Sequence, residues 1–168
     1  MLNVRTKILM ILTVGFLSCS TAKKEEENTS AVQTAVQQNE LPNLTIVSDE
    51  QRLSVRDLAG KKLILILFQS SCDHCQAEGQ QIRENIKAFE KYTLYFVSAD
   101  ASNQIKNYAE NLGLDKIENV HFASTDVQQI LDIFGPIQAP SVYIYSDKGK
   151  LIKSFVGQTD IDNIIKAL

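Results

Sequence analysis

The hydrophobic residues that follow residue 40 fall into short stretches that predict β-strands. These stretches are Thr45–Val47, Arg52–Ser54, Lys62–Phe68, Leu94–Val97, Asn119–Phe122, Ser141–Tyr145 and Leu151–Val156. Lys62–Phe68 is apolar at almost every position, which predicts a strand that is buried on both faces of a sheet. Asp147-Lys148-Gly149 separates the last two stretches and has the composition of a tight turn, so these stretches predict an antiparallel hairpin. The first two stretches predict a shorter hairpin.

Between the strands, the spacing of apolar residues becomes helical. Apolar residues lie three or four positions apart in three segments: Ile105, Tyr108, Ala109 and Leu112; Val127, Ile130, Leu131 and Phe134; and Ile161, Ile164, Ile165 and Leu168. The candidate N-cap residues of these helices are Ser102, Thr125 or Asp126, and Thr159 or Asp160. Gly113 ends the first helix and Gly135-Pro136 ends the second. Strands that alternate with helices, followed by a closing hairpin and a last helix, predict an α/β sandwich with a mixed sheet.

A further helix is predicted directly after the buried strand, and it begins at a pair of cysteines. The pair is Cys72-Asp73-His74-Cys75, and the helix extends to about Lys91. One face of this helix is formed by Cys75, Glu78, Ile82, Ile86 and Phe89, and the opposite, polar face by Asp73, Gln76, Gln80, Arg83 and Lys87. We therefore expect Cys72 at the helix N-terminus and Cys75 one turn further along, on the inward face.

The position of this cysteine pair favours redox chemistry. The thiolate is the reactive form of cysteine, and the unpaired N–H groups and the helix dipole favour that form at Cys72. Cys75 is shielded and close enough to resolve a mixed disulfide formed by Cys72. A zinc site is the alternative, but zinc normally takes four protein ligands. No second cysteine pair follows, and the only other histidine, His121, is better interpreted as a strand residue than as a metal ligand.

The N-terminus has the pattern of a secretory signal. Two basic residues precede an apolar run, Ile8–Leu17, that is shorter than the roughly 20 residues of a membrane-spanning helix. The run ends in Phe16-Leu17-Ser18-Cys19, which resembles the lipobox of bacterial lipoproteins, whose cysteine is lipidated and becomes the first mature residue. An ordinary signal peptide with an incidental cysteine is the alternative. With Cys19 assigned to the anchor, the three cysteines of the chain leave one pair, Cys72 and Cys75.

Composition divides the chain into three parts. Residues 1–18 form the predicted signal peptide, residues 19–40 the lipidated cysteine and a polar tether, and residues 41–168 the folded domain. The tether contains no aromatic residue, so it cannot bury enough apolar surface to offset its ordering entropy. The formal net charge is only −3, which gives no reason to expect a nucleic-acid partner or a polybasic membrane face. No feature indicates an oligomer, and we expect a monomer.

Several residues of the predicted domain together match one superfamily. They are Pro42, Leu53 through Gly60-Lys61, Cys72 and Cys75, Ala139-Pro140, and Gly157. In these features the domain resembles the thioredoxin superfamily, specifically its TlpA-like, membrane-tethered thiol–disulfide oxidoreductases. The resemblance implies a three-layer α/β/α sandwich with an N-terminal β-hairpin. It also implies a redox-active Cys72–Cys75 disulfide with no further cofactor, and a cis-proline at Pro140 that packs against the disulfide and blocks metal access.

Two positions depart from that family, and a third follows one of its branches. Ser71 stands where a tryptophan commonly precedes the first cysteine, and Ile66 where ordinary thioredoxins have a buried aspartate. Glu78 matches a glutamate of the TlpA-like branch. Because Glu78 lies on the inward helix face, we expect burial to raise the pKa of its carboxyl and to suit it to proton exchange with Cys75. A surface glutamate is the alternative.

The two residues between the cysteines are expected to tune the reactivity of the pair. His74 resembles the histidine of the oxidising members of the superfamily, and a cation beside Cys72 stabilises the thiolate and hence the reduced form. Asp73 has the opposite effect, because a negatively charged carboxylate near Cys72 disfavours the thiolate. The two effects partly cancel, so the direction of electron flow stays open. An incidental surface histidine is the alternative.

These features predict an extracytoplasmic thiol–disulfide oxidoreductase, lipid-anchored through Cys19 and facing the periplasm or exterior. Cys72 attacks a protein disulfide, Cys75 resolves it, and Glu78 handles the proton. The expected partners are protein thiol or disulfide substrates, the membrane, and a membrane electron donor or acceptor. A disulfide oxidase, a copper-binding lipoprotein that uses the same cysteines, and a structural lipoprotein are the alternatives. Peroxidase activity is not expected, because Gln69 occupies the threonine position of the peroxiredoxin pattern.

Overall fold

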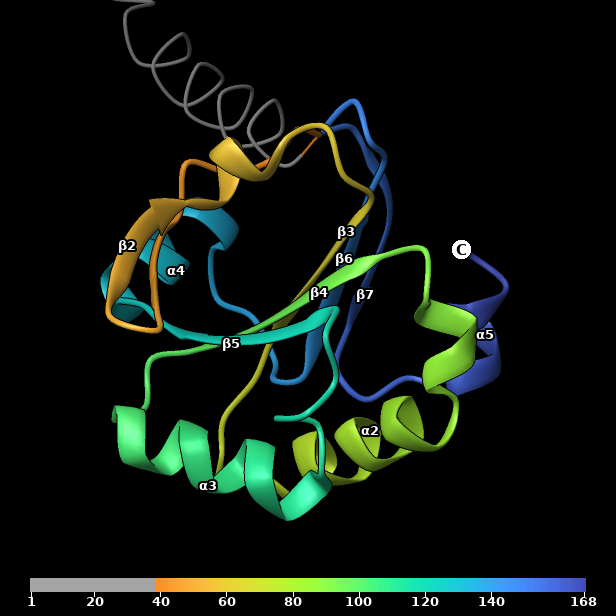
Figure 1. Cartoon of the computed structure of the whole chain (residues 1–168). Helices are drawn as coiled ribbons and strands as arrows, with labels where there is room; N and C mark the ends of the chain where they lie inside the picture. The colour runs from red at the N-terminus through yellow and green to blue at the C-terminus, as the bar shows by residue number, and fades with distance from the viewer. Residues whose placement is uncertain (1–38) are drawn as a thin grey trace, which may run out of the picture.

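The computed structural model describes residues 39–168 (Figure 1). Its elements are, in chain order, β1 (Thr45–Ser48), β2 (Gln51–Ser54), the 3-10 helix η1 (Val55–Leu58), β3 (Leu63–Leu67), α2 (Asp73–Glu84), the 3-10 helix η2 (Ile86–Phe89), β4 (Thr93–Ser98), α3 (Ser102–Leu112), β5 (Val120–Ser124), α4 (Val127–Phe134), β6 (Ser141–Tyr145), β7 (Leu151–Val156) and α5 (Ile161–Ile165). In this part of the chain the strands form one seven-stranded sheet in the order β2-β1-β5-β4-β3-β6-β7. Strands β3, β4 and β5 are parallel, β6 is antiparallel to β3, and β7 is antiparallel to β6.

Central strand β3 divides the core into two halves, because its side chains alternate between the two faces of the sheet. Ile64 and Ile66 pack with α2, α3 and α5 on one face. Leu63, Leu65 and Leu67 pack with α4 and η1 on the other. All five side chains are fully buried. The sheet is therefore the middle layer of the expected three-layer α/β/α sandwich, and the unbroken apolar run of β3 results from helices covering both of its faces.

The helix that follows the cysteine pair is shorter than predicted. It ends at Glu84, and the short 3-10 helix η2 continues the chain to Phe89. Asn85 separates the two, with φ −105° and ψ 21°, and its side-chain Nδ2 donates a hydrogen bond to the carbonyl oxygen of Gln81 at 2.9 Å. Asparagine side chains that bond locally to the backbone compete with helical geometry in this way. The prediction of one continuous helix to about Lys91 is therefore wrong.

The other helices begin and end close to their predicted positions. Asp126 and Asp160 cap α4 and α5, each accepting a hydrogen bond from the backbone N–H two residues further on. Helix α3 includes Ser102 as its first residue, and Ala101, not Ser102, holds the N-cap position. Gly113 ends α3 in the left-handed conformation, with φ 62°.

The predicted N-terminal hairpin is present, but among the described strands it pairs with the rest of the sheet through one residue pair only. Strand β1 pairs with β2 over four residues, whereas its ladder with β5 contains the single pair Val47–Ser124. Asp49 and Glu50 form the turn between β1 and β2, with φ of 48° and 64°. This is the backbone of a type I′ turn, in which Asn and Gly are the usual residues. The chain therefore turns away from β5 directly after β1.

The predicted signal peptide, the lipidation site Cys19 and residues 20–38 of the predicted tether lie outside the described residues. Glu40 already belongs to the folded part, where it forms an isolated bridge and an ion pair with Lys150. Within residues 39–168, no helix combines the length and the apolar character needed to cross a membrane.

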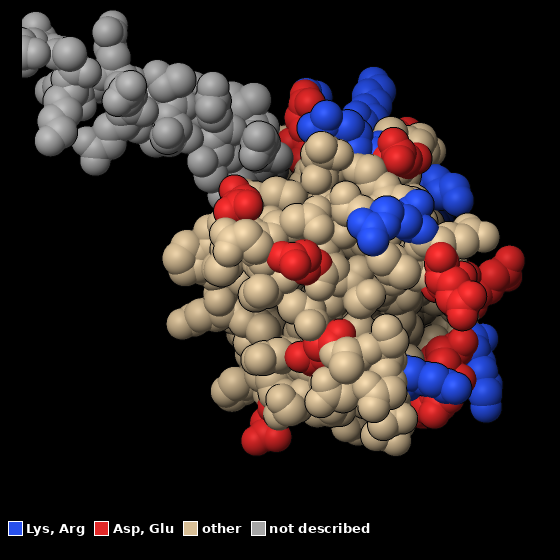
Figure 2. Space-filling model, turned by 90° about the vertical axis from the view of Figure 1, so that its left-hand side faces the viewer, with Lys and Arg blue, Asp and Glu red and all other residues tan. Residues whose placement is uncertain are grey.

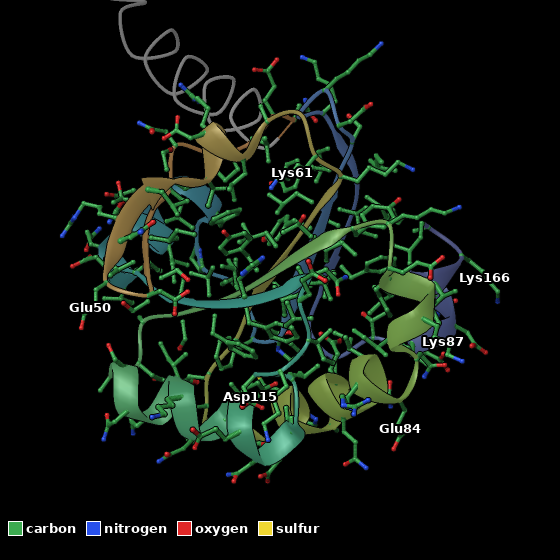
Figure 3. All side chains as sticks on the ribbon, viewed as in Figure 1. Glu50, Lys61, Glu84, Lys87, Asp115 and Lys166 are labelled. Carbon is green, nitrogen blue, oxygen red and sulfur yellow. The ribbon has the colours of Figure 1, made fainter. Side chains whose placement is uncertain are left out.

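Charged side chains are spread over the surface. Figure 2 shows the side that carries the hairpin and α4, where Asp and Glu are scattered among uncharged residues and Lys and Arg lie toward the margins. Glu50, Glu84 and Lys166 lie at separate places on the periphery, at the hairpin tip, the end of α2 and the C-terminal helix region (Figure 3).

Candidate active site

Cys72 occupies the N-cap position of α2, at the end of the loop that follows β3. Its backbone is extended, and its carbonyl oxygen accepts a hydrogen bond from the backbone N–H of Gln76 at 3.0 Å, the first such bond of the helix. The side chain is half-buried, and Sγ lies 3.8 Å from the carbonyl oxygen of Ala139. The Ala139–Pro140 peptide bond is cis. The fold thus brings the loop that contains Pro140 against the first cysteine.

Cys75 lies one helical turn further along and is only 1% exposed. The backbone N–H of Gln69 donates to its Sγ at 3.5 Å. Burial raises the pKa of the Cys75 thiol to about 12, and the hydrogen bond from Gln69 opposes this shift. Smaller contributions from Cys72 and Glu78 raise the pKa further. Both cysteines are free thiols. The pair is therefore asymmetric: Cys72 is accessible and Cys75 is shielded.

Glu78 follows Cys75 on the same buried face of α2, and it is also 1% exposed. Its Oε2 accepts a hydrogen bond from the backbone N–H of Thr159 at 3.1 Å, whereas Oε1 is buried with no hydrogen-bond partner among the described residues. Burial raises the pKa of the Glu78 carboxyl from 4.5 to about 7, against the opposing effect of the Thr159 bond. The helical spacing correctly placed this side chain inward. A carboxyl group with such a pKa exchanges protons readily near neutral pH.

Tyr108 on α3 belongs to the site, although the sequence pattern placed it only in the core. Its buried hydroxyl group donates a hydrogen bond to the carbonyl oxygen of Cys75 at 2.7 Å. The close approach of α3 requires Gly79, because a Cβ atom there would lie 2.4 Å from the Tyr108 hydroxyl oxygen and 2.6 Å from Leu112 Cδ1. The sequence did contain a sign of this contact. A glycine inside a predicted helix costs about 1 kcal/mol and often has a packing reason.

A carboxylate from beyond β4 holds the loop before the cysteine motif. Asp100 Oδ2 accepts hydrogen bonds from the backbone N–H of Ser70 at 2.6 Å and from its hydroxyl group at 2.7 Å. Burial acts to raise the pKa of Asp100, but the hydrogen bonds from Ser70 and Ser98 outweigh it and lower the pKa. From the helix side, Gln76 Nε2 donates to the carbonyl oxygen of Ser70 at 2.7 Å. The loop that positions the first cysteine is thus fixed from two sides.

Asp73 and His74, the two residues expected to tune the pair, are both exposed. His74 Nδ1 lies 2.6 Å from Oε1 of Gln158, in the loop between β7 and α5. Their charges act largely through solvent, where electrostatic effects are weak and screened by salt.

His121 lies away from the cysteine pair, because β4 separates its strand from β3. Its ring stacks on Tyr95, with centroids 4.8 Å apart. Burial lowers the pKa of His121, and the nearby Asp49 carboxylate opposes this. The interpretation of His121 as a strand residue is therefore confirmed. In residues 39–168, no three His, Cys, Asp or Glu side chains are grouped in a way that could hold a metal ion.

A mixed sheet between two helical layers, with a dithiol at the start of the helix after the central strand, defines a thioredoxin-like protein. The sequence model of the AhpC/TSA family matches residues 20–154, and the chain belongs to this family. Its relatives include ResA of Bacillus subtilis, named a thiol-disulfide oxidoreductase, which is 21% identical over 162 residues; the match covers 93% of this chain and 85% of ResA. Family and relatives together identify the chain as a thioredoxin-like oxidoreductase.

Solved structures agree with this fold. A secreted Mycobacterium tuberculosis disulfide oxidoreductase homologous to E. coli DsbE matches with a TM-score of 0.62 and 15% identity, over 74% of this chain and 93% of its own. Arabidopsis thaliana ScoI, determined with copper bound, matches with a TM-score of 0.58 and 15% identity. The match covers 74% of this chain and 94% of the ScoI chain. At such identities these likenesses establish the fold alone.

Proposed function

We propose that the protein is an extracytoplasmic thiol–disulfide oxidoreductase that reduces or isomerises protein disulfides through Cys72 and Cys75. The observation that supports this most strongly is the contrast between two free thiols at one helix end. Cys72 is half-buried at the N-terminus of α2, whereas Cys75 is 1% exposed. A client sulfur reaches the first thiol and not the second. Cys72 is therefore assigned the attack, and Cys75 the resolution.

Reduction proceeds in two exchange steps. The Cys72 thiolate attacks one sulfur of a client disulfide, the client S–S bond breaks, and the departing client sulfur takes up a proton. Cys75, as its thiolate, then attacks Cys72 Sγ; the Cys72–Cys75 disulfide forms and the second client thiol leaves. Two electrons have passed to the client, and a dithiol electron donor at the membrane restores the reduced pair. In isomerisation, a second client thiol attacks the mixed disulfide instead.

The second step requires Cys75 to lose its proton. Burial holds the pKa of this thiol at about 12, so a base is needed at neutral pH. Glu78, whose pKa is raised to about 7, is partly ionised there and lies one turn away on the same helix face. Its Oε1 has no hydrogen-bond partner within residues 39–168. Formation of the mixed disulfide also removes the charge at Cys72 that contributes to the high pKa of Cys75. Glu78 is therefore assigned the role of proton acceptor.

The loop before β6 is assigned to client contact. The Ala139 carbonyl oxygen lies 3.8 Å from Cys72 Sγ, so a client chain joined to that sulfur would run beside it. Pro140 is the next residue, and it has no backbone N–H group that could donate a hydrogen bond to the client chain. The Ala139 carbonyl oxygen is therefore the backbone group that this loop offers to the client.

We also propose that the protein lies in the cell envelope, held by lipid on Cys19 and facing the periplasm or exterior. The N-terminal residues support this, since an apolar run that follows basic residues ends at that cysteine. An oxidising compartment also suits a protein whose partners are protein thiols and disulfides. A membrane electron donor or acceptor completes the proposed cycle.

Trapping experiments with scrambled ribonuclease A test the assignment of the two cysteines. The Cys75→Ser variant attacks but cannot resolve, so it should accumulate a mixed disulfide that non-reducing electrophoresis separates. The Cys72→Ser variant should form several-fold less, because its remaining thiol is buried and largely protonated. Equal trapping by the two variants would contradict the assignment.

The copper-bound ScoI structure is the reason to keep copper binding as a second candidate. In residues 39–168 the two thiols are soft ligands of the kind that copper prefers, but no third His, Cys, Asp or Glu joins them. The described residues therefore fit a closed copper site poorly. Copper titration of the reduced protein and of the Cys72→Ser/Cys75→Ser variant separates the two functions. Stoichiometric, thiol-dependent binding, together with no reduction of ribonuclease, would favour the copper function.

A further inference from the structure

Within residues 39–168, strand β5 is paired along its whole length on only one of its two edges. Strand β4 pairs with β5 over its whole length. On the other edge, β1 meets β5 at Val47–Ser124 alone, and the chain then turns away at Asp49 and Glu50. Within the described part of the chain, most of this second edge is therefore unpaired, although β5 lies inside the sheet order.

The hydrogen bonds with β4 fix which backbone groups of β5 face the free edge. Leu94 donates its N–H to the carbonyl oxygen of Asn119, just before β5. Thr125, just after β5, donates its N–H to the carbonyl oxygen of Ser98. In a parallel ladder the residues that bond to one neighbour alternate along the strand, so the odd-numbered residues of β5 bond to β4. The even-numbered residues direct their backbone groups to the other edge.

Only some of the backbone groups of these even-numbered residues have a hydrogen-bond partner among the described residues. Ser124 pairs with Val47, and the N–H of Val120 donates to the carbonyl oxygen of Ile117 at 3.0 Å. The N–H and C=O of Phe122, and the C=O of Val120, face this edge and have no paired residue of a neighbouring strand within residues 39–168. An extended chain placed there would find donors and acceptors in the pattern of a β-ladder.

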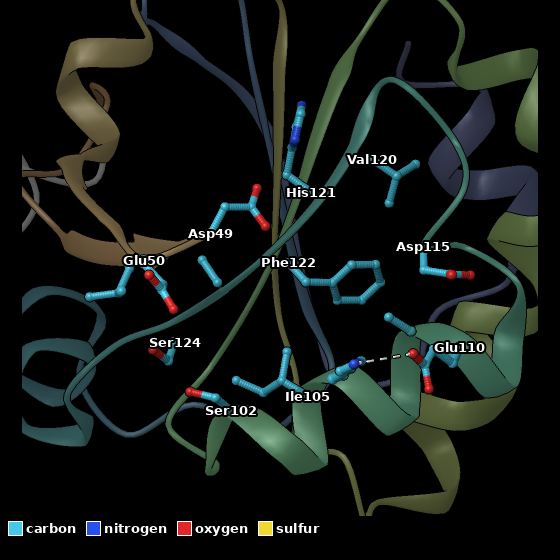
Figure 4. Close-up of a pocket in the computed structure, with 14 residues that line it drawn as sticks. Asp49, Glu50, Ser102, Ile105, Glu110, Asp115, Val120, His121, Phe122 and Ser124 are labelled. Atoms are coloured by element: carbon cyan, nitrogen blue, oxygen red, sulfur yellow. Dashed lines mark ion pairs between the residues drawn. The ribbon is translucent and has the colours of Figure 1, made fainter.

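The free edge opens into a cavity of about 660 Å³, shown in Figure 4. The walls of the cavity are β5, the tip of the β1–β2 hairpin and α3. Asp49 and Glu50 lie on the hairpin side, and Ile105 and Glu110 on the α3 side, with Phe122 between them (Figure 4). The cavity thus has a strand edge as its floor and side-chain walls on both sides.

The two walls differ in chemistry. On one side of β5, the His121 ring stacks on Tyr95 close to the Asp49 carboxylate of the hairpin tip. On the other side, Phe122 and Ile105 belong to the half of the core that contains α2, α3 and α5, and they offer apolar surface. Because side chains of an added strand alternate between the two sides, it would meet both walls.

The cavity is also negatively charged. Among the lining residues that the structure describes, the carboxylates are Asp49, Glu50, Glu110 and Asp115, and Lys106 is the only Lys or Arg. Lys106 Nζ already lies 3.8 Å from Glu110 Oε1, so its charge is balanced in part. A neutral or acidic segment would leave the remaining carboxylates without counter-charges, whereas a basic one supplies them.

We propose that the free edge of β5 binds an extended, basic segment of a partner protein as an added strand. Its backbone pairs with Phe122, an apolar side chain packs on Phe122 and Ile105, and Lys or Arg side chains meet the carboxylates at the rim. Binding of this kind derives affinity from the backbone and specificity from the alternating side chains. The surface does not include Cys72 or Cys75, so it would hold a partner independently of the thiol chemistry.

The probe for this surface is a fluorescently labelled peptide of alternating Lys and Val, compared with an otherwise identical Glu–Val peptide. The full-length protein should bind the Lys–Val peptide, with affinity that falls as salt is raised. Hydrogen–deuterium exchange of the β5 segment should slow several-fold on binding. Equal binding of both peptides, or unchanged exchange in β5, would overturn the proposal. Protection that grows with protein concentration in the absence of peptide would assign the edge to a second copy and overturn it as well.

The matched variants are Asp49→Asn/Glu50→Gly and Glu84→Gln/Glu90→Gln. Both remove two negative charges, but Glu84 and Glu90 do not line the cavity. Asn-Gly is a preferred sequence for the type I′ turn, so the first variant keeps the hairpin. It should bind the Lys–Val peptide about tenfold more weakly, and the second variant as well as wild type. An equal loss of affinity in both variants would mean that the peptide responds only to the net charge of the protein, and it would overturn the proposed site.

Discussion

The hydroxyl group of Tyr108 donates a hydrogen bond to the carbonyl oxygen of Cys75, with 2.7 Å between the two oxygens. The bond joins α3 to the first turn of α2, which contains Cys75 and directly follows the N-cap residue Cys72. Because it ends on the backbone and not on sulfur, Tyr108 acts as a positioning residue for the pair. The structure therefore fixes the thiols through contacts that the cysteine motif itself does not contain.

Replacing Tyr108 with Phe removes this bond, and the free energy of unfolding should fall by about 1 kcal/mol. Tyr92→Phe is the matched control, because the Tyr92 hydroxyl donates to the carbonyl oxygen of Leu168 at 2.6 Å, in a contact that involves neither cysteine. Urea unfolding should show similar losses in both variants. Only Tyr108→Phe should change the rate at which Cys75 resolves a mixed disulfide, by several-fold. Equal rates in both variants would make Tyr108 purely structural.

Gly79→Ala should destabilise the protein although alanine is the better helix former. Helix propensity alone predicts a gain of about 1 kcal/mol. The new Cβ would lie 2.4 Å from the Tyr108 hydroxyl oxygen, however, and such overpacking costs about 1–3 kcal/mol. Thermal unfolding should show a lowered Tm, whereas Gln80→Ala on the exposed face should change it little. A raised Tm in Gly79→Ala would contradict the close contact between α2 and α3 at this position.

Glu78 should make the stability of the reduced protein depend on pH. Its pKa is about 7 in the folded protein and 4.5 as its ordinary value, so the folded state binds this proton more tightly. The resulting stability is fully present below pH 4.5 and is lost as the pH rises through 7, on the order of 3 kcal/mol in all. Glu78→Gln should remove this slope in urea unfolding between pH 5 and 8. Exposed Glu84→Gln is the control, and a slope retained in Glu78→Gln would contradict the buried titration.

The same substitution tests the proposed proton transfer separately. Glu78→Gln removes the base, so resolution of the mixed disulfide should slow by at least roughly a hundredfold, within the range of general base catalysis. The measurement is the decay of a preformed mixed disulfide at pH 7. The first attack by Cys72 should be little affected. An unchanged decay rate would remove Glu78 from the mechanism while leaving its effect on stability intact.

Asp100→Asn should loosen the loop that precedes Cys72. The carboxylate accepts two hydrogen bonds from Ser70, and bonds to a charged group contribute about 1.5–3 kcal/mol each. Because the pKa of Asp100 is lowered on folding, its contribution is present above its ordinary value of 3.8 and lost as the pH falls through the folded value. Urea unfolding at pH 7 should show the loss, and the difference from wild type should shrink under acid conditions. Exposed Asp115→Asn should have no comparable effect.

Local sequence features were sufficient for the elements that define the fold. The β3 strand was predictable because both of its faces are buried, which leaves an unbroken apolar run. The inward position of Glu78 followed from helical spacing alone. The early end of α2 was missed because one polar residue, Asn85, decides it against an apolar face that continues to Phe89.

The supporting contacts of the site were not predictable. Asp100 reaches Ser70, and Tyr108 reaches Cys75, from residues that are 30 and 33 positions away. Neither contact leaves a periodic pattern, since a tyrosine on an apolar helix face and an aspartate after a strand each have ordinary explanations. The free edge of β5 was missed for a similar reason. Its existence depends on where the hairpin turns, which the strand patterns do not specify.

A redox titration of the Cys72–Cys75 couple in the full-length protein shows whether the two cysteines act as one dithiol–disulfide pair. The protein is equilibrated in dithiol–disulfide buffers and its thiols are trapped with maleimide, with Cys72→Ser/Cys75→Ser as the background. We predict a single two-electron transition with a midpoint between about −200 and −270 mV, as in thioredoxin and the glutaredoxins. A midpoint near −120 mV would still show a redox-active dithiol, but the protein would then oxidise its clients instead of reducing them. Independent modification of the two thiols at every buffer ratio, with no two-electron transition, would contradict a redox function of the pair.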